Sequence, residues 1–531
     1  MNDAVARHAE LVSALMRPAA YPHPAERIEL IETHISSVLL AGAYAYKVKK
    51  PVDLGFVDFS TLERRRFYCE EEVRLNRRTA PDLYLGVVPI TGSPGQPRVA
   101  GDGEAIDYAV QMRRFDNDAL LDVRARRGAL QAAEIDRLAQ SIAELHAVAA
   151  RATPESDYGT PERVLHWARE NFTQLRARAL PAAADASLSR LAAWTAHEFE
   201  RRRPAMVQRA VDGFIRECHG DLHLGNIVLL DGRPTLFDAI EFNPQLHWID
   251  VASDVAFVFM DLFDHGMPRF AWRLLDRYLQ ASGDYGGLQL LRFYAVYRAL
   301  VRAKVALIRA DQPQLAADAR AAALARCAHC VRLAETLQSG AKRPLLAITF
   351  GLSGAGKTTV AGDLLERLGA VRVRSDVERK RLFGIGQTAR MAGGELDALY
   401  AQEANRRTYG RLAELARTIF AAGYPAIVDA AFLKRAERDE FRALARDLGA
   451  RFALIECVAS PAALRARLAQ RAAHDTDASD ATVAVLERQM ATHEPVADDE
   501  RADTFTIATD ADASIFEARC GEAAARLAEE N

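Results

Sequence analysis

The stretch that decides the fold is Gly351-Leu-Ser-Gly-Ala-Gly-Lys-Thr358, which follows the apolar segment Leu345-Leu-Ala-Ile-Thr-Phe350 and opens a helical pattern. In such a strand–turn–helix setting, glycines let backbone N–H groups surround phosphates, a lysine reaches the β and γ oxygens, and a hydroxyl ligates magnesium. The stretch therefore predicts a P-loop that binds a nucleoside triphosphate with Mg²⁺. A glycine-rich turn without a ligand is the alternative. The predicted nucleotide-binding residues are Gly351, Ser353, Gly354, Ala355, Gly356, Lys357, Thr358 and Thr359, with Lys357 also assigned to catalysis and Thr358 to the metal.

Beyond Pro344 the chain alternates between short apolar segments and longer helical ones. This alternation predicts a parallel sheet covered by helices. The segment Ala426-Ile-Val-Asp-Ala430 ends in a single acid, whereas a motor ATPase usually carries an acidic pair there. Hydrolysis for its own sake is therefore disfavoured, and Asp429 is predicted to bind the metal through water. The expected strands are 345–350, 371–375, 426–430, 452–458 and 504–508.

The segment Ser375-Asp-Val-Glu-Arg379 resembles the Asp-x-x-Arg arrangement of small P-loop kinases such as polynucleotide kinase, gluconate kinase and the zeta-toxin group. The resemblance implies that Asp376 accepts a hydroxyl proton while Arg379 orients the substrate. A helix-capping Asp followed by a solvated Arg is the alternative.

A second segment, Leu464-Arg-Ala-Arg-Leu-Ala-Gln-Arg471, is similar to the lid of the same kinases. It places Arg467 and Arg471 one helical turn apart, just before the polar stretch 474–480. The resemblance implies that these cations bind nucleotide and neutralise charge on the transferring phosphoryl group. Arginines on an exposed helix face are the alternative.

In the first 340 residues, polar residues cluster in His219-Gly-Asp-Leu-His-Leu-Gly-Asn226 and in Leu236-Phe-Asp-Ala-Ile-Glu241. These segments resemble the catalytic and metal-binding loops of aminoglycoside phosphotransferases, choline kinases and related protein-kinase-like enzymes. The resemblance implies that Asp221 accepts or orients the acceptor hydroxyl and that Asn226 and Asp238 hold magnesium. Glu241 is a further metal contact under this interpretation, and His219 braces the loop. A coincidental turn rich in Gly, His and Asp is the alternative.

Upstream, the sequence predicts a small sheet with one long helix over about 61–78. The same resemblance implies that Tyr46-Lys-Val-Lys49 supplies the phosphate-binding lysine. Because Lys47 and Lys49 point to one face of a strand, the sequence does not choose between them. Lys47 is preferred, with Glu71 as its acidic partner, and a surface lysine is the alternative. The turn at Gly42, expected to cover the triphosphate, lacks G-x-G-x-x-G.

Length and composition limit the remaining possibilities. A chain of 531 residues with 50% apolar residues predicts two to four folded domains. A net charge of −3 gives no basis for expecting nucleic acid as a partner. The sequence contains no apolar run long enough to predict a membrane span, so a cytoplasmic protein is expected. The six cysteines are expected to be reduced thiols, and Cys327-Ala-His-Cys330 is interpreted as two helix-packing cysteines rather than a metal or redox pair.

The order of the two regions resembles bacterial two-domain proteins described as bifunctional phosphotransferase/ATP-binding proteins. The implied fold is multi-domain, α+β and then α/β: a protein-kinase-like N-lobe at 1–115, its helical C-lobe at 116–337, a linker at 338–344, and a P-loop kinase domain at 345–531. The implied function is transfer of phosphoryl groups from ATP, with Mg²⁺, to hydroxyl groups of small molecules at two sites. A nucleotide-responsive regulator is the main alternative, and a nucleic-acid-stimulated NTPase ranks last. Neither the acceptors, nor ATP over GTP, nor the oligomeric state is predicted.

Overall fold

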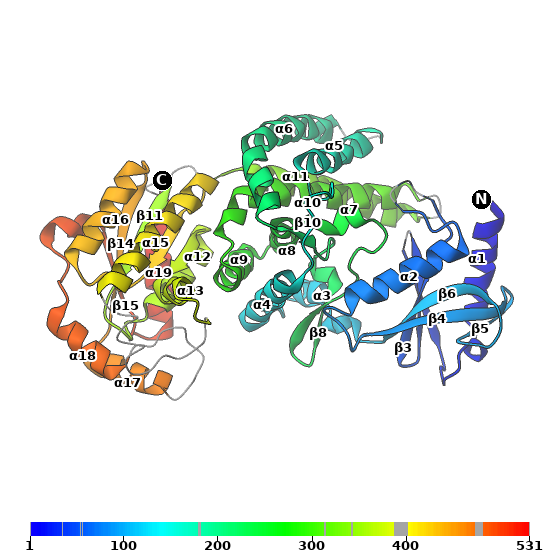
Figure 1. The fold of residues 1–531 in the computed structure, drawn as a ribbon, viewed down its shortest axis with the longest axis horizontal. Coiled ribbons are helices and arrows are strands. Elements are labelled where there is room, and N and C mark those ends of the chain that lie inside the picture. The colour runs from blue at the N-terminus through cyan, green and yellow to red at the C-terminus, as the bar shows by residue number, and fades with distance from the viewer. Residues whose placement is uncertain are drawn as a thin grey trace. The chain divides into compact units, whose positions relative to one another are not determined.

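The computed structural model describes residues 2–33, 35–53, 55, 57–178, 182–312, 315–340, 344–386, 402–472 and 482–529. The chain forms two compact units (Figure 1). The first comprises Met1–His265 and Phe293–Thr336, and the second comprises Gly266–Arg292 and Leu337–Asn531. Within the described residues, no helix is both long and apolar enough to cross a bilayer.

The first unit begins with a six-stranded antiparallel sheet in the order β1-β2-β3-β6-β4-β5. The sheet separates two apolar clusters. Because side chains alternate along a strand, Tyr46 and Val48 pack with Leu11 and Leu15 on one face, whereas Ala45 packs on the other face with the long helix α2. The elements are α1 (Asn2–Leu15), β1 (Ile28–Glu32), β2 (Ser36–Ala41), β3 (Tyr44–Lys49), α2 (Leu62–Asn76), β4 (Tyr84–Ser93), β5 (Gln96–Val99) and β6 (Ala105–Arg113).

The rest of the first unit is mostly helical, with two small two-stranded sheets, β10-β7 and β8-β9. Helix α8 is buried through most of its length and packs beneath the loop that precedes β8. The elements are α3 (Leu121–Arg126), α4 (Ala132–Val148), α5 (Pro161–Arg176), α6 (Ala182–Val211), β7 (Ile215–Glu217), the short 3-10 helix η3 (Leu224–Asn226), β8 (Ile227–Leu230), β9 (Arg233–Leu236), α7 (Pro244–His247), β10 (Trp248–Asp250), α8 (Val251–Asp264), α10 (Leu288–Ala310) and α11 (Ala317–Gln338).

The cysteines of both units are buried free thiols. Cys327 and Cys330 lie on α11, where burial raises the pKa of the Cys330 thiol to about 12. Both side chains contribute to helix packing, as the sequence predicts.

The second unit contains a five-stranded sheet in the order β12-β13-β11-β14-β15, in which every pairing is parallel. The predicted parallel sheet is confirmed, and the five expected strands match to within one residue at each end. The elements are β11 (Leu345–Phe350), α12 (Lys357–Leu368), β12 (Val371–Arg374), α13 (Ser375–Leu382), α15 (Gln402–Ala422), β13 (Ala426–Asp429), α16 (Arg435–Asp447), β14 (Arg451–Val458), α17 (Pro461–Ala472), α18 (Val483–Thr492), β15 (Thr504–Ala508) and α19 (Ala513–Glu529).

One helix from earlier in the chain also belongs to the second unit. Helix α9 (Pro268–Ser282) packs on α12 and β12, and Trp272 adds to the apolar cluster around the parallel sheet. The sequence-based boundaries assign this segment to the helical C-lobe. In the structure, Gly266–Arg292 is part of the compact unit that contains the P-loop.

Candidate active sites

The loop His219–Asn226 lies between β7 and β8 and is held by buried acids behind it. Asp254 of α8 accepts hydrogen bonds from the backbone N–H groups of His219 (2.8 Å) and Gly220 (2.9 Å). His219 is itself buried, and its Nε2 lies 2.9 Å from the carbonyl oxygen of Phe237, next to Asp238. Burial lowers the pKa of His219. The neutral ring therefore links the two polar segments, which is the bracing role expected from the sequence.

Asp221 and Asn226 lie side by side in this loop. The Asn226 amide donates to Asp221 Oδ2 at 3.1 Å and to the Asp221 carbonyl at 3.0 Å. Burial alone would raise the pKa of Asp221, but His223, whose Nε2 lies 3.5 Å from the carboxylate, and Arg302 together hold that pKa well below its usual value. Asp221 is therefore an ionised acceptor, suited to orient a hydroxyl group.

Both strand lysines point to the face of the sheet that carries α2, and both are paired with acids. Lys47 Nζ lies 2.8 Å from Glu72 and 2.5 Å from Asp238. Lys49 Nζ lies 2.7 Å from Glu72 and also pairs with Glu241. The structure thus brings Lys47, Lys49 and Asp238 together and engages both lysines in ion pairs. Glu241 reaches Lys49, where the sequence analysis expected a metal contact.

The partner of the lysines is Glu72, and the choice of Glu71 is corrected. Glu71 pairs with Arg74 on the partly exposed side of α2. The phase of the helix explains the difference, because Cys69, Glu72, Val73 and Asn76 form its buried side. Burial alone would raise the pKa of Glu72, but the two ammonium groups outweigh burial and lower it to about 2. Glu72 is therefore ionised at neutral pH.

Two backbone features shape this site. Asp238 has φ +62°, a left-handed conformation that Asp adopts more readily than most residues, and its N–H donates to the Tyr84 hydroxyl at 3.1 Å. Gly42 lies in the turn between β2 and β3 with φ +58°, and a Cβ there would meet the Pro24 carbonyl at 2.6 Å. Glycine at position 42 thus has a local steric reason that is independent of any phosphate.

The P-loop joins β11 to α12, as the sequence predicts. Gly351, Gly354 and Gly356 all have positive φ, and a Cβ on Gly351 would lie 2.5 Å from the Cys457 carbonyl oxygen. Lys357 Nζ donates to the carbonyl oxygens of Gly351 and Leu352, each at 2.9 Å. The lysine is therefore folded over the loop at the amino end of α12, where backbone N–H groups and the helix dipole favour an anion.

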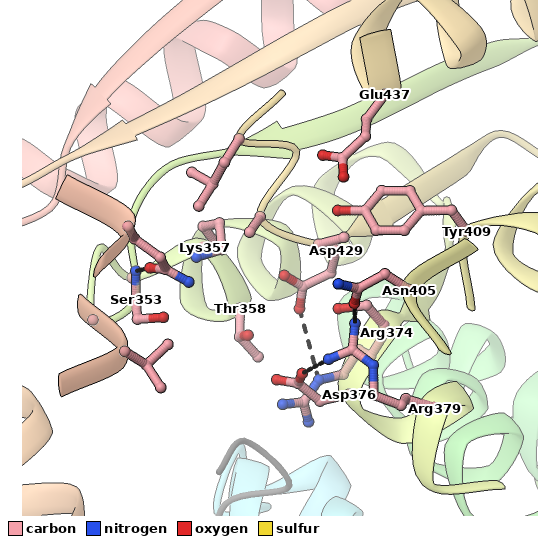
Figure 2. A pocket seen from close by; sticks show the side chains of 18 of the residues that line it. Ser353, Lys357, Thr358, Arg374, Asp376, Arg379, Asn405, Tyr409, Asp429 and Glu437 are labelled. Atoms are coloured by element: carbon pink, nitrogen blue, oxygen red, sulfur yellow. Dashed lines mark hydrogen bonds and ion pairs between the residues drawn. The ribbon is translucent and has the colours of Figure 1, made fainter. Parts of the chain in front are cut away.

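A cavity of about 320 Å³ opens beside the P-loop (Figure 2). Its walls come from the carboxyl ends of β12 and β13 and from α13, α15, α16 and α18. Parallel strands place their carboxyl ends at one edge, so residues distant in sequence converge there. The lining residues include Ser353, Gly354, Gly356, Lys357, Thr358, Thr359, Arg374, Asp376, Arg379, Asn405, Tyr409, Asp429, Glu437 and Gln489. Ala355 is buried behind the loop.

Asp376 and Arg379 share one wall of this cavity. Arg379 Nη1 lies 3.9 Å from the Asp376 carboxylate, and its Nη2 donates to Asn405 Oδ1 at 2.9 Å. Asp376 is partly exposed in the first turn of α13. The carboxylate is therefore accessible to a molecule in the cavity, and the nearby guanidinium is fixed by α15.

Asp429 ends β13 and faces Thr358 across the cavity (Figure 2). Its side chain is buried, and its Oδ2 makes no hydrogen bond within the part of the chain that the structure describes. The Thr358 hydroxyl and the Asp429 carboxylate are oxygen donors of the kind that Mg²⁺ prefers. Together with phosphate oxygens, these two groups would hold the ion.

Of the two predicted lid arginines, the structure describes the side chain of Arg467. Arg467 lies behind the P-loop, where its Nη1 donates to the Gly354 carbonyl at 3.0 Å and to Thr509 Oγ1 at 2.9 Å. It supports the loop backbone and is absent from the described cavity wall. The side chain of Arg471 and the polar stretch 474–480 lie outside the described residues.

Sequence reasoning missed several cavity residues. Gln489 Oε1 accepts the Ser353 backbone N–H at 2.8 Å, and Tyr409 accepts the Phe432 N–H at 3.3 Å. Burial raises the pKa of Glu437, which lies beside Tyr409 (Figure 2). These residues belong to helices whose sequences show only ordinary amphipathic patterns, so no local signal marks them.

Comparison with known proteins agrees with this two-part organisation. Residues 100–294 match the family model described as "Phosphotransferase enzyme family", and residues 346–496 match the model described as "AAA domain". An uncharacterized protein of Mycobacterium tuberculosis is 31% identical over 466 residues, covering 87% of this chain and 90% of the relative. A protein of Mycobacterium bovis, also uncharacterized, matches to the same extent. The chain belongs to their family. Both of its domains belong to kinase families.

Two solved structures illustrate the likeness of each part. A choline/ethanolamine kinase family protein from Mesorhizobium loti covers 63% of this chain and 99% of its own length, with 13% identity and a TM-score of 0.37. A gluconokinase from Sinorhizobium meliloti covers 36% of this chain and 97% of its own length, with 20% identity and a TM-score of 0.26. The fold rests on the strand order and the two family matches: a protein-kinase-like domain is followed by a P-loop kinase domain with a parallel sheet, as the sequence predicts.

Proposed function

We propose that this protein is a phosphotransferase with two sites, each of which transfers a phosphoryl group from ATP, with Mg²⁺, to a hydroxyl group of a small molecule. The single observation that carries the proposal is the cluster in the first unit. There Lys47, Glu72 and Asp238 are joined by ion pairs of 2.5 and 2.8 Å. Kinases of this class need a strand lysine, its acidic partner and a metal-binding acid assembled together.

Asp221 and Asn226 support the same function for the first unit. Phosphoryl transfer needs little covalent chemistry from the protein, so catalysis depends on positioning and on charge stabilisation. The ionised Asp221 would orient the acceptor hydroxyl and accept its proton. Asn226 and Asp238 would hold Mg²⁺, which would neutralise charge on the phosphates. Lys47 would bind phosphate oxygens once Asp238 turns to the metal, and Lys49 would keep Glu72 in place.

The cavity in the second unit supports a second transfer site. Lys357 and the P-loop N–H groups would bind the β and γ phosphates, and Thr358 and Asp429 would hold Mg²⁺. Asp376 would accept the hydroxyl proton, and Arg379 would orient the acceptor against the γ-phosphate. The cavity, about 320 Å³ in volume, is within the size range of small-molecule sites.

The test is acceptor-dependent ADP release by the full chain, screened against sugars, sugar acids, polyols and amino alcohols. Asp221→Asn and Asp376→Asn should each lower transfer at their own site by about 10²- to 10⁴-fold, the usual contribution of a positioned proton acceptor. Asp231→Asn and Asp447→Asn, exposed acids in the same two units, serve as controls and should retain activity. An active parent whose transfer survives in both single variants and in the double variant would contradict the proposal.

A regulator that binds nucleotide at the first unit without turnover is the second candidate. It is favoured by the turn at Gly42, which lacks G-x-G-x-x-G and whose glycine is explained by the nearby Pro24 carbonyl rather than by a phosphate. Phosphoryl transfer that depends on Asp221 in an Asp376→Asn background would exclude this candidate.

A further inference from the structure

Helix α9 brings two polar side chains to the base of the P-loop site. Asp276 forms a two-fold pair with Arg372 of β12, with Nε to Oδ1 at 3.1 Å and Nη2 to Oδ2 at 2.7 Å. Both side chains are buried, with 4% and 2% of their area exposed. Gln280, one turn further along α9, donates to Asp276 at 2.6 Å and accepts from Arg374 Nη1 at 3.3 Å. The two α9 residues therefore bind both arginines of β12.

The same two arginines face the predicted metal-binding acid. Arg372 Nη1 lies 3.9 Å and Arg374 Nε lies 3.7 Å from Asp429 Oδ2. Both distances exceed the range of a hydrogen bond, and Oδ2 is buried without a hydrogen-bond partner among the described residues. Arg372 Nη1 is instead directed to the Thr358 carbonyl at 2.8 Å. The arginines lie near the carboxylate but do not occupy it.

We infer that Asp276 and Gln280 are positioning residues of the P-loop site, which hold Arg372 and Arg374 away from Asp429 and keep its carboxylate available to Mg²⁺. The inference rests on the proposed function of the second unit. A guanidinium and a carboxylate at this separation readily form a direct, two-fold hydrogen-bonded pair. Without Asp276, the Arg372 guanidinium would be buried without its partner, and Asp429 is the acid that lies within 4 Å of it.

Helix α9 therefore contributes to the P-loop site although it lies outside residues 346–496, the stretch matched to the AAA domain family. Asp276 and Gln280 lie within residues 100–294, which match the phosphotransferase family, whereas Asp429 lies within residues 346–496. The pair Asp276–Arg372 joins positions 96 residues apart. The metal affinity of the P-loop site thus depends on helix α9, which precedes the P-loop region in the chain and lies within the stretch matched to the phosphotransferase family.

The test is the Mg²⁺ dependence of binding of a fluorescent ATP analogue to the full chain, carried out in an Asp238→Asn background so that the first unit contributes little. Asp276→Asn should raise the Mg²⁺ concentration for half-maximal binding by about tenfold, the lower range for loss of a group that orients a metal ligand. Arg269→Gln is the matched control. Arg269 also lies on α9 and pairs with Asp363 and Glu366 of α12, but it is 44% exposed. The control should leave the Mg²⁺ dependence unchanged.

A second variant separates positioning from a general loss of stability. Replacing the pair by apolar side chains, Asp276→Leu with Arg372→Met, removes the buried charges and the competing Arg372, while Gln280 still binds Arg374. The Mg²⁺ dependence should then return to that of the parent. If Asp276→Asn does not fold, Gln280→Ala should show a smaller rise in the same direction. An unchanged Mg²⁺ dependence in Asp276→Asn, or an equal rise in the double variant, would overturn the inference. Failure of the proposed function is distinct, because then Lys357→Met would bind the analogue as well as the parent.

Discussion

The two candidate sites differ in what holds them together. In the first unit, five charged side chains, Lys47, Lys49, Glu72, Asp238 and Glu241, form one ion-pair network. In the second unit, the phosphate-binding turn is shaped by backbone, with positive φ at Gly351, Gly354 and Gly356 and close packing against β14. The first site should therefore be sensitive to the loss of a charge, and the second to the addition of a single carbon atom.

The difference also shows how each site would receive phosphate. In a network of alternating charges, partners would have to exchange when nucleotide and Mg²⁺ bind, because Lys47 cannot pair with Asp238 and a phosphate equally well. A loop of backbone N–H groups needs no such exchange, since its donors are already directed by conformation. The first site is an ion-pair network of side chains, whereas the second is a loop whose backbone donors are already in position.

The largest expected effect follows from removing the buried lysine of the network. Lys49→Met would leave the buried Glu241 without its ion-pair partner and Glu72 with Lys47 alone, so the free energy of unfolding of the first unit should fall by about 3–5 kcal/mol. Denaturant unfolding followed by circular dichroism measures this. Lys50→Met is the matched control, because Lys50 pairs with the exposed Glu32 and should change stability by less than about 1 kcal/mol. Equal losses in the two variants would contradict the proposed importance of the network.

A smaller effect is expected from one added carbon in the P-loop. Gly351→Ala would place a Cβ 2.5 Å from the Cys457 carbonyl at φ +146°, so the loop must shift, at a cost of about 1–3 kcal/mol. Nucleotide affinity should fall together with the stability of the second unit, as measured by titration calorimetry and unfolding. Gly449→Ala has a similar strain, at φ +63°, but meets no atom within 4 Å, and it should lose stability without losing nucleotide affinity.

The smallest effect is expected at Glu71, which neighbours Glu72 on α2. Glu71→Gln should change nucleotide binding at the first unit hardly at all, since Glu71 contacts Arg74 and neither lysine. Glu72→Gln, the matched variant, should weaken it markedly because Lys47 and Lys49 both lose their shared partner. Binding of a fluorescent ATP analogue in a Lys357→Met background distinguishes the two. Weaker binding in Glu71→Gln than in Glu72→Gln would reverse the assignment made from the structure.

The glutamates show where prediction from the sequence ends. The P-loop and the loop of Asp221 and Asn226 could be predicted because their chemistry is carried by residues close together in the chain, and the parallel sheet could be predicted from its alternating segments. The choice among three consecutive glutamates depends on the phase of one helix against a sheet. The buried residues Cys69, Val73 and Asn76 mark the side of α2 that faces the sheet. Their spacing from Glu72 would have indicated Glu72 as the partner of the lysines.

The pairing of α9 with β12 could not be predicted from the sequence, for a different reason. Asp276 and Gln280 lie in a helix whose sequence pattern is simply amphipathic. Their partners Arg372 and Arg374 follow about 95 residues later, in a short buried strand. Pairing across such a separation is decided by tertiary packing. No local sequence signal specifies it.

The position of α9 in the chain also affects folding during synthesis. Residues 266–292 leave the ribosome well before β11, α12 and β12, the elements on which α9 packs. At typical rates of synthesis, the 96 residues between Asp276 and Arg372 correspond to a delay of roughly 5–20 s. During that interval the apolar side of α9, including Trp272, has no partner from its own unit. The nascent chain therefore carries an amphipathic helix whose apolar side stays uncovered by its own unit until β11, α12 and β12 have been synthesised.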